Sequence, residues 1–432
     1  MSLITDLIII GSGPGGYRAA DYAAKNGLQV IVIEESHAGG TCLNCGCIPT
    51  KTFCHEAELA GYGLPVEFQK IMTRKQQVVE QLRSGVETLL SQPNITFVRG
   101  KASFKDAQTV VANGEEYQAK NIIIATGSHA MMPASIEGIH LPHVLSSTEL
   151  LDIDHIPQKL CIIGAGVIGM EFASVFNSFG SEVVVVEFMK ECLPNMDGDI
   201  AKRLRKCLEK RGIKFYLQSG VKKIDDKQVV FDCKGKENFV EADTILVATG
   251  RGANVDGLNL DAVGITYNRK GIAVDDNMQT NIPNIYAIGD VNGRQMLAHA
   301  ATFQGFRAIN HIIGKSDSIR FDIMPAAVFT SPEAACVGVT ESFCKENNIA
   351  YTCHKGYYRA NGKALAIDAS EGMVKLLTNE NDIIIGCHVY GAHAADLVQE
   401  IAALMNNDTT LNKLHDIIHA HPTLEEILQE LN

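Results

Sequence analysis

The chain has 432 residues, a formal charge of −12 at pH 7 and 46% hydrophobic residues. That length is sufficient for roughly two to four domains with cores of their own. The acidic balance argues against nucleic acid as a partner, because binding phosphates requires a basic surface. No apolar run reaches the length of about 18 residues that a membrane-spanning helix needs, so we expect no membrane partner.

The start of the chain and the distribution of its cysteines both favour the cytoplasm. Residues 1–6 carry no basic group, and Leu7 to Ile10 is typical of a strand rather than of the apolar part of a signal peptide. The chain has 12 cysteines, but outside residues 42–54 they occur singly, unlike the disulfide framework of a secreted protein. We therefore expect a cytoplasmic protein.

The first motif combines a buried strand, a glycine-rich turn and a helix. Leu7 to Ile10 is continuously apolar, as in a strand buried on both faces. The turn after it carries three glycines, Gly11, Gly13 and Gly16. A helix of small residues should end at Gly27, and a second strand, Val30 to Ile33, is closed by Glu34. This order predicts a dinucleotide site, in which the pyrophosphate lies at the helix N-terminus and the acid binds a ribose hydroxyl.

A cluster of cysteines follows this unit. Three cysteines lie within six residues, at Cys42, Cys45 and Cys47. One interpretation is a metal site that uses all three, with Cys54 or His55 as the fourth ligand. The other is a redox pair, in which two of the three form a reversible disulfide beside a cofactor.

The surroundings of the cysteines favour the redox interpretation. Residues five apart on a regular helix lie too far apart for a disulfide, so Cys42 and Cys47 can pair only across a distorted turn. Gly46 and Pro49 permit such a turn. A zinc site of this kind usually takes a second ligand pair from elsewhere, and no other close Cys/His pair of that spacing is present in the sequence.

The glycine motif then occurs a second time. Residues 160–163 form a strand, and the turn after it carries Gly164, Gly166 and Gly169. A helix should stop at Gly180, and a strand over 182–186 is closed by Glu187, at the same offset of 23 residues from the first glycine as in the first motif. The chain is therefore predicted to hold two dinucleotides. No arginine follows Glu187 closely to bind a 2′-phosphate, which favours NAD over NADP.

Three further strand ends indicate how the two units are connected. Residues 122–127 and 245–250 are each an apolar strand that ends in Ala-Thr-Gly, and residues 285–290 are a strand that ends in Gly-Asp. Asp290 is either part of a simple turn or a carboxylate directed at a ribityl or ribose hydroxyl. The repetition predicts that the first dinucleotide domain is split, with the second inserted into it.

The predicted fold class is α/β, with two nested Rossmann-like dinucleotide-binding domains and a C-terminal α+β domain. We expect the first domain to comprise residues 1–149 and 273–317, and the second residues 150–272. The third, residues 318–432, lacks a glycine phosphate loop, and we expect it to be a dimerisation module. Its predicted strands are 326–330, 373–377 and 383–389, and its predicted helices are 394–405 and 411–418.

The end of the third domain allows two interpretations. Thr423 and Glu426 have the spacing of a capping box that opens a last helix, with His419 and His421 as ordinary surface residues. Alternatively, a histidine here takes part in proton transfer, for which its pKa is well suited.

Taken together, the motifs resemble those of a known family. The segment 39–51 with its cysteines, the two glycine motifs, the Ala-Thr-Gly pair, Gly289-Asp290 and the terminal His-x-His-Pro-Thr-x-x-Glu are similar to the flavin-dependent pyridine nucleotide-disulfide oxidoreductases. Within that family they are most similar to the dihydrolipoamide dehydrogenases. The resemblance runs from residue 5 to the C-terminal end. It implies FAD at the first glycine motif, NAD at the second, and a homodimer formed by the C-terminal domain.

The resemblance also implies roles for individual residues. Cys42 would be the thiol that exchanges with the dihydrolipoyl substrate, and Cys47 the sulfur beside the flavin. Cys45 occupies a variable position of the motif and would be neither. His421 would be the base for the substrate thiol, oriented by Glu426, and would act on the cysteines of the partner subunit.

The remaining site residues that the resemblance implies bind or flank the cofactors. Lys51 and Glu171 would form an ion pair beside the flavin. The FAD contacts would be Gly11, Gly13, Gly16, Glu34, Thr41, Lys51, Ala102, Gly127, Asp290 and Ala298. The NAD contacts would be Gly164, Gly166, Gly169, Glu187, Val221 and Gly250. No residue is assigned to a metal.

The predicted function is therefore oxidation of protein-bound dihydrolipoamide, with reduction of NAD. The partner would be a lipoyl-bearing acyltransferase of a 2-oxo acid dehydrogenase complex, or a glycine-cleavage carrier protein. Because no lipoyl domain precedes the first strand, we expect the substrate to come from another chain. Alternatives are a related disulfide or metal-ion reductase, and a non-catalytic flavoprotein that senses redox state or metal. Four positions depart from the usual pattern, namely Glu35, Cys45, Ala253 and Ala300.

Overall fold

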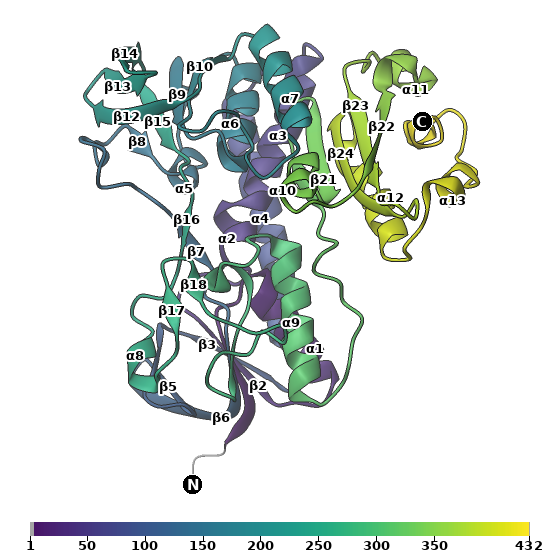
Figure 1. Cartoon of the computed structure of the whole chain (residues 1–432). Helices are drawn as coiled ribbons and strands as arrows, with labels where there is room; N and C mark the ends of the chain where they lie inside the picture. Colours follow the sequence, from purple (N-terminus) through teal and green to yellow (C-terminus); the bar gives the residue numbers. More distant parts are fainter. Residues whose placement is uncertain (1–3, 432) are drawn as a thin grey trace. The chain divides into compact units, whose positions relative to one another are not determined.

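The computed structural model describes residues 4–431 and is shown in Figure 1. Residues 1–3, on which part of the prediction about the start of the chain rests, lie outside the described residues, as does residue 432. The chain divides into two compact units. Unit 1 comprises residues 1–52, 69–131 and 250–319, and unit 2 comprises residues 53–68, 132–249 and 320–432. The predicted domain limits at 149 and 272 remain a prediction.

Unit 1 is built on a seven-stranded sheet in which the first glycine motif lies at the centre. Its order is β3-β2-β1-β6-β5-β4, with β19 paired to β6. The parallel strands are β1 (Thr5–Ile10), β2 (Val30–Glu34), β3 (Ile95–Arg99), β6 (Glu115–Ile124) and β19 (Ile285–Ala287). The antiparallel strands are β4 (Ala102–Phe104) and β5 (Thr109–Ala112). Continuous apolar runs form the centre because both faces of these strands are covered.

Small residues at their contact let two helices of unit 1 pack closely together. Helix α1 (Pro14–Lys25) packs against α9 (Ala298–Ile312). A Cβ on Gly305 of α9 would lie 3.1 Å from the Cβ of Ala19. The two helix backbones can therefore lie close together because both residues are small. The remaining elements of unit 1 are α2 (Gly40–Cys45), β7 (Ser128–Ala130), β16 (Arg251–Ala253), α8 (Leu260–Val263), β17 (Tyr267–Asn268), β18 (Gly271–Ile272) and η1 (Gly289–Asn292). Helices α3 (Cys47–Gly61) and α4 (Phe68–Leu90) each have residues in both units.

Unit 2 contains the second glycine motif in a five-stranded parallel sheet of order β11-β10-β9-β15-β8. Its strands are β8 (Val144–Leu145), β9 (Lys159–Ile163), β10 (Glu182–Val186), β11 (Lys214–Tyr216) and β15 (Thr244–Val247). A three-stranded antiparallel sheet adds β12 (Ser219–Ile224), β13 (Gln228–Cys233) and β14 (Lys236–Glu241). The helices are α5 (Ser147–Leu150), α6 (Val167–Ser178) and α7 (Gly198–Lys210).

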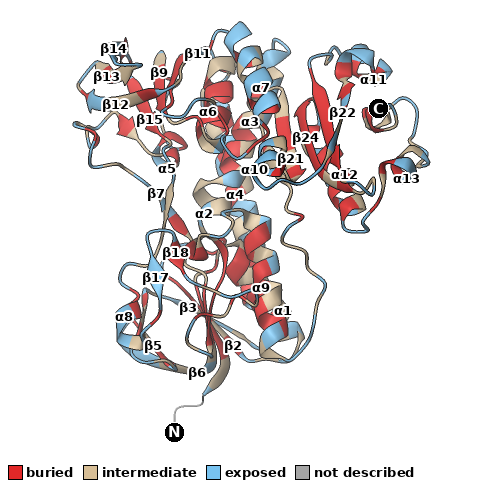
Figure 2. Ribbon diagram, in the orientation of Figure 1, coloured by how far each residue is buried: buried red, intermediate tan, exposed pale blue. Residues whose placement is uncertain are grey.

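The C-terminal part of unit 2 is an antiparallel sheet of order β20-β21-β24-β23-β22, covered by helix α12. Its strands are β20 (Ala326–Val328), β21 (Glu333–Gly338), β22 (Thr352–Tyr357), β23 (Met373–Thr378) and β24 (Ile384–Gly391). Its helical segments are α10 (Glu341–Glu346), η2 (Tyr358–Ala360), α11 (Gly362–Ala366), α12 (Ala394–Met405), α13 (Leu411–His415) and η3 (Glu425–Leu428). In Figure 2, the central strands of this sheet and one face of α12 are buried, as expected for an α+β core.

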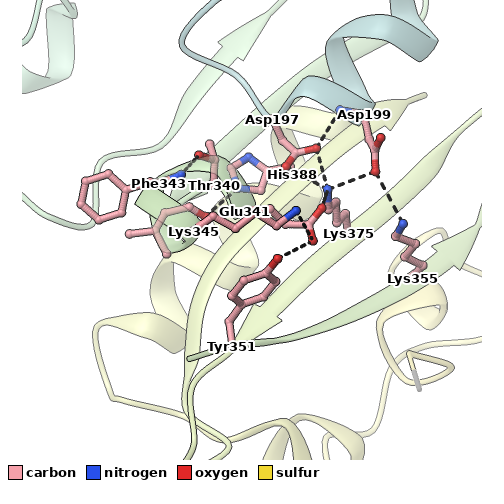
Figure 3. Close-up of polar contacts among 11 residues, drawn as sticks. Asp197, Asp199, Thr340, Glu341, Phe343, Lys345, Tyr351, Lys355, Lys375 and His388 are labelled. Atoms are coloured by element: carbon pink, nitrogen blue, oxygen red, sulfur yellow. Dashed lines mark hydrogen bonds and ion pairs between the residues drawn. The ribbon is translucent and has the colours of Figure 1, made fainter. Parts of the chain in front are cut away.

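A buried ion cluster, shown in Figure 3, links strand β23 of the C-terminal sheet to the N-terminus of α7 and to α10. Lys375 on β23 has no exposed surface, and its Nζ donates to both oxygens of Asp197 at 2.8 and 2.9 Å and to Asp199 at 3.2 Å. Asp197 caps the N-terminus of α7. Lys375 also forms an ion pair with Glu341, which accepts a hydrogen bond from Tyr351. The sequence analysis did not find this cluster, because its members are scattered between residues 197 and 375.

The structure confirms the predicted α/β fold class and corrects two details near the C-terminus. The predicted helix over 411–418 ends at His415, whose Nε2 bonds the carbonyl of Leu431 at 3.0 Å while the chain turns to pack Ile417 against the core. The predicted last α-helix is the short 3-10 segment η3. Only half of its capping box forms, because the backbone N–H of Thr423 donates to Glu426 but the buried Thr423 hydroxyl has no hydrogen-bond partner among the described residues.

Candidate active site

The first glycine turn follows β1, and its three positions are occupied by glycine for different reasons. Gly11 has φ +100°, and a Cβ there would lie 2.4 Å from the carbonyl oxygen of Ala125. A Cβ on Gly16 would lie 2.0 Å from the carbonyl oxygen of Gly11. A Cβ on Gly13, at the N-cap of α1, would meet no described atom within 4 Å. The fold itself requires the outer two glycines, whereas the open space at Gly13 fits the approach of a pyrophosphate to the helix N-terminus.

Glu34, at the end of β2, is held over this turn. It is buried, and its Oε2 accepts hydrogen bonds from the backbone N–H and the hydroxyl of Ser12, both at 2.8 Å. Its Oε1 accepts from the N–H of Ser36 at 2.9 Å. Each carboxylate oxygen has two lone pairs, so Glu34 keeps capacity to accept from a ribose hydroxyl.

The second glycine turn repeats this geometry in unit 2. A Cβ on Gly164 would lie 2.5 Å from the carbonyl oxygen of Ala248, and one on Gly169 would lie 2.0 Å from that of Gly164. A Cβ on Gly166 would again meet no described atom within 4 Å. The turn therefore has the same open space, at the N-cap of α6.

The acid of the second turn is held in the same manner as the first. Glu187 is buried; its Oε2 accepts from the N–H of Ala165 at 2.5 Å, and its Oε1 from the N–H of Met189 at 2.6 Å. Neighbouring Phe188 is 77% exposed. A buried carboxylate at this position favours a free 2′-hydroxyl over a 2′-phosphate, because two negative charges would repel each other.

Asp290 takes part in a polar cluster that the sequence analysis did not predict. It lies in η1, and its Oδ2 accepts a hydrogen bond from the Ser128 hydroxyl at 2.5 Å. The side chain of Arg251 donates to the same hydroxyl at 2.7 Å and to the Ser128 carbonyl at 2.6 Å. Arg251 directly follows the second Ala-Thr-Gly, and that position is the only sequence signal that pointed to it.

The other predicted cofactor contacts are distributed over both units. In unit 1, Thr41 lies on α2, Ala102 is the first residue of β4, Gly127 has φ +71° after β6, and Ala298 is the first residue of α9. Gly250, with φ +139°, is counted with unit 1, whereas Val221 lies on β12 in unit 2. Their contacts with FAD and NAD remain predictions.

The predicted ion pair also has one member in each unit. Lys51 lies on α3 within unit 1, and Glu171 is buried on α6 in unit 2. Oε1 of Glu171 accepts a hydrogen bond from the backbone N–H of Phe329 at 2.9 Å. The pairing of Lys51 with Glu171 stays a prediction.

The cysteine segment has a helix break at Gly46. Helix α2 ends at Cys45, Gly46 has φ −142° and ψ −112°, and α3 begins at Cys47. A Cβ on Gly46 would lie 2.9 Å from the carbonyl oxygen of Thr41, which makes glycine the best residue for this tight turn. Cys42 is half-buried and Cys47 is exposed. This break is the distorted turn that a pairing of Cys42 with Cys47 requires.

The two cysteines on either side of the break interact. A hydrogen bond with Cys47, together with burial, raises the pKa of the Cys42 thiol. No group of three or more His, Cys, Asp or Glu side chains among residues 4–431 has the arrangement of a metal site.

The two histidines near the C-terminus have different environments. Nδ1 of His421 is 2.9 Å from Oε1 of Glu426, and the His421 side chain is 80% exposed. Hydrogen bonds from the Thr423 N–H and from His421 lower the pKa of Glu426. An ionised Glu426 fixes the proton of His421 on Nδ1 and leaves Nε2 to accept one. His419 is instead buried, with its Nε2 bonded to Glu400 at 2.8 Å.

The chain matches known proteins over almost its whole length. Residues 5–305 match the pyridine nucleotide-disulphide oxidoreductases, and residues 324–432 match the dimerisation domain of that family. The chain belongs to the pyridine nucleotide-disulphide oxidoreductases. Its cofactors are FAD and NAD, and the two glycine turns fit such dinucleotides.

Relatives within the family include several dihydrolipoyl dehydrogenases. The proteins from Chlamydia muridarum and Bacillus subtilis are 38% and 37% identical to the chain, over 98% of it and 95% and 97% of their own lengths. The mitochondrial protein of Pisum sativum is 37% identical over 98% of the chain and 90% of its own length. Among solved structures, the Cu(II) complex of the HOCl-induced flavoprotein disulfide reductase RclA from Escherichia coli has a TM-score of 0.90 at 30% identity, covering 99% of both chains.

No helix within residues 4–431 combines the length and apolar character needed to cross a membrane.

Proposed function

We propose that the protein is a dihydrolipoamide dehydrogenase, which oxidises protein-bound dihydrolipoamide to lipoamide through a Cys42–Cys47 disulfide and FAD and reduces NAD to NADH. The observation that carries this proposal is the hydrogen-bonded pair Cys42 and Cys47 across the Gly46 break. The dihydrolipoyl dehydrogenases that match 98% of the chain support it.

The cysteines perform a thiol–disulfide exchange. One thiolate of the dihydrolipoyl group attacks Sγ of Cys42, the Cys42–Cys47 bond breaks, and Cys47 leaves as a thiolate. The second lipoyl sulfur then attacks the first, the bond to Cys42 breaks, and cyclic lipoamide departs. Cys42 takes up a proton as it leaves, in keeping with the raised pKa of its thiol.

His421 supplies the base for this exchange. Only thiolates attack disulfides efficiently, so a dihydrolipoyl thiol must lose its proton first. Glu426 holds Nδ1 of His421 and leaves Nε2 to take that proton. His421 is exposed within its own chain, which suits a residue that serves the site of a second subunit.

The remaining residues hold and position the cofactors. Gly11, Gly13, Gly16 and Glu34 would bind FAD, and the matching residues of the second turn would bind NAD. When bound, FAD supplies the two-electron chemistry between the dithiol and the nicotinamide. Lys51 and Glu171 would pair beside the flavin, and a fixed positive charge there would favour the Cys47 thiolate.

The proposed setting of the enzyme is the cytoplasm, where it would act as a homodimer formed through its C-terminal domain. Its substrate would be the lipoyl group of an acyltransferase in a 2-oxo acid dehydrogenase complex, or of a glycine-cleavage carrier protein. A second candidate is a related disulfide reductase, which the similarity to the flavoprotein disulfide reductase RclA supports. A reductase of the glutathione type would use NADPH. We favour the first candidate because Glu187 opposes a 2′-phosphate.

Steady-state kinetics can separate the two candidates. We expect the purified protein to form NADH from dihydrolipoamide and NAD at a kcat/KM well above that for NADPH-driven reduction of glutathione disulfide or other small disulfides. A protein that lacks dihydrolipoamide activity but reduces disulfides with NADPH would overturn the proposal in favour of the second candidate.

A further inference from the structure

The cysteine segment contains two disulfide spacings that share one residue. Cys42 and Cys47 have four residues between them, and Cys42 and Cys45 have two. The proposed function uses the first pair and gives Cys45 no task. Two residues between cysteines is the spacing of many disulfide oxidoreductase motifs, in which one thiol resolves a mixed disulfide on the other.

Helix geometry places Cys42 and Cys45 within disulfide range. Both lie on α2, three residues apart. With a rise of 1.5 Å per residue, a radius of about 2.3 Å and about 3.6 residues per turn, their Cα atoms are about 5 Å apart. Disulfides span Cα distances of roughly 4.4–6.8 Å. Cys47, in contrast, reaches Cys42 only because the helix is broken at Gly46.

The residues between the two cysteines hold α2 in place. Leu43 is buried, and the side-chain amide of Asn44 donates to the carbonyls of Ala38 at 3.0 Å and Gly40 at 2.9 Å. Nε of Arg83 donates to the Asn44 side-chain oxygen at 2.7 Å. Because these contacts hold α2, a disulfide between the half-buried Cys42 and Cys45 requires only rotation of the two side chains and a small adjustment of the helical turn that carries them.

We infer that Cys45 is a second resolving thiol, which competes with Cys47 for Cys42. In the oxidised enzyme, the Cys45 thiolate attacks Sγ of Cys42, the Cys42–Cys47 bond breaks, a Cys42–Cys45 disulfide forms and Cys47 leaves as a thiolate. Two sulfurs remain oxidised throughout, so no external oxidant is needed. This isomerisation rests on the proposed function only in that it starts from the Cys42–Cys47 disulfide.

The same thiol gives the segment a further activity toward low-molecular-weight disulfides. If a small disulfide such as oxidised glutathione forms a mixed disulfide with Cys42, the Cys45 thiolate attacks Sγ of Cys42. The Cys42–Cys45 bond forms, and reduced glutathione leaves as its thiolate. Cys45 thus removes glutathione from Cys42, and Cys47 takes no part in the reaction.

The test uses FAD-loaded Cys47→Ser protein and oxidised glutathione as the probe. After exchange, thiols are trapped with N-ethylmaleimide and the protein is digested with trypsin. Residues 26–51 form one tryptic peptide that contains Cys42, Cys45 and position 47, so the other cysteines of the chain do not interfere. Mass spectrometry then distinguishes an internal disulfide, which has lost two hydrogens, from a glutathione adduct.

We expect Cys47→Ser to accumulate the Cys42–Cys45 disulfide. The matched control, Cys45→Ser/Cys47→Ser, should retain glutathione on Cys42, with at least about a tenfold higher adduct level. Equal adduct levels in the two variants would overturn the inference. FAD content and thermal unfolding show whether both variants remain folded.

Wild-type protein provides a second measurement that does not depend on any variant. Fragmentation of the 26–51 peptide from glutathione-equilibrated protein shows which cysteine carries the maleimide. Maleimide on Cys47 with a Cys42–Cys45 disulfide, in about one molecule in ten or more, supports the inference. Disulfide found only between Cys42 and Cys47 contradicts it. Because neither readout uses dihydrolipoamide, loss of the proposed function would leave this test intact.

Discussion

At the scale of single residues, the two dinucleotide turns show which glycines serve the fold and which leave room for a ligand. In each turn, the first and third glycines are required by nearby carbonyl oxygens, while the middle one faces open space among the described residues. Sequence alone predicted both turns but could not show why the first glycine of each is needed, because the carbonyls of Ala125 and Ala248 lie more than 80 residues further along the chain.

This difference predicts opposite effects for two alanine substitutions. Gly13→Ala should change the stability of the apoprotein by no more than about 0.5 kcal/mol, but should lower FAD retention, because the added methyl group enters the space for the pyrophosphate. Gly11→Ala should instead destabilise the apoprotein, by about 1–3 kcal/mol, since it combines φ +100° with a backbone clash. Thermal unfolding of the apoproteins and the flavin-to-protein absorbance ratio measure the two effects. The interpretation fails if Gly13→Ala retains FAD as well as wild type does.

Glu187 carries the prediction of nucleotide specificity. Repulsion between its buried carboxylate and a 2′-phosphate should weaken the binding free energy of NADP by several kcal/mol. We therefore expect kcat/KM for NAD to exceed that for NADP by about 100-fold or more. Glu187→Gln should narrow this difference, because it removes the charge and keeps the size of the side chain. Equal kcat/KM values for NAD and NADP in wild type would mean that the second turn does not select between them.

At the scale of secondary-structure elements, features determined by neighbouring residues in the sequence were predicted accurately, whereas features determined by distant residues were not. The strands around both turns were predicted almost to the residue, since continuous apolar runs and glycine stops are local signals. The break between α2 and α3 was expected from Gly46 and Pro49. The cluster around Lys375 could not be found, because a lysine inside a strand is ordinarily a solvated side chain and its partners Asp197 and Glu341 belong to other elements.

The Lys375 cluster predicts a large effect of one substitution on stability. Lys375→Met should destabilise the protein by about 3–5 kcal/mol, because it leaves the buried carboxylate of Asp197 without its partner. The matched control is Lys355→Met, because Lys355 is 38% exposed and reaches Asp199 only at 3.5 Å. That change should cost less than about 1 kcal/mol. Denaturant unfolding of the two variants compares them directly, and similar losses would contradict the assigned role of Lys375.

The same cluster determines the pH range over which Lys375 stabilises the folded protein. Burial opposes ionisation of Glu341, but hydrogen bonds from Lys375 and Tyr351 lower its pKa, so its contribution is present above the unfolded pKa of about 4.3 and is lost as pH falls through the folded value. Burial likewise opposes the charge of Lys375, but its carboxylate partners raise its pKa. That contribution is present below the unfolded pKa of about 10.4 and is lost as pH rises through the folded value. Wild type should therefore exceed Lys375→Met in stability most between about pH 5 and 10, measured as unfolding midpoints across this range.

At the scale of the whole molecule, the far C-terminus carries a residue whose proposed task lies outside its own chain. His421 is paired with Glu426 and exposed, and nearby Ile418 is 95% exposed, whereas His419 is buried against Glu400. The motif alone could not separate the two histidines, because the burial of His419 depends on its contact with Glu400 of α12, which lies outside the motif. Because residues 324–432 match a dimerisation domain, we expect the exposed pair of His421 and Glu426 to face a second subunit.

A subunit-mixing experiment tests this arrangement. His421→Gln should lower dihydrolipoamide oxidation by about 10²–10⁴-fold, the usual range for loss of a general base, while the variant still binds FAD. His419→Gln is the control, since its loss should affect stability more than rate. When inactive Cys42→Ser chains exchange subunits with inactive His421→Gln chains, each mixed dimer has one site with both changes and one site with neither. Activity should therefore return to about half that of wild type per mixed dimer, because one of its two sites is intact. Mixed dimers that are shown to form but stay inactive would mean that His421 does not serve the partner's cysteines.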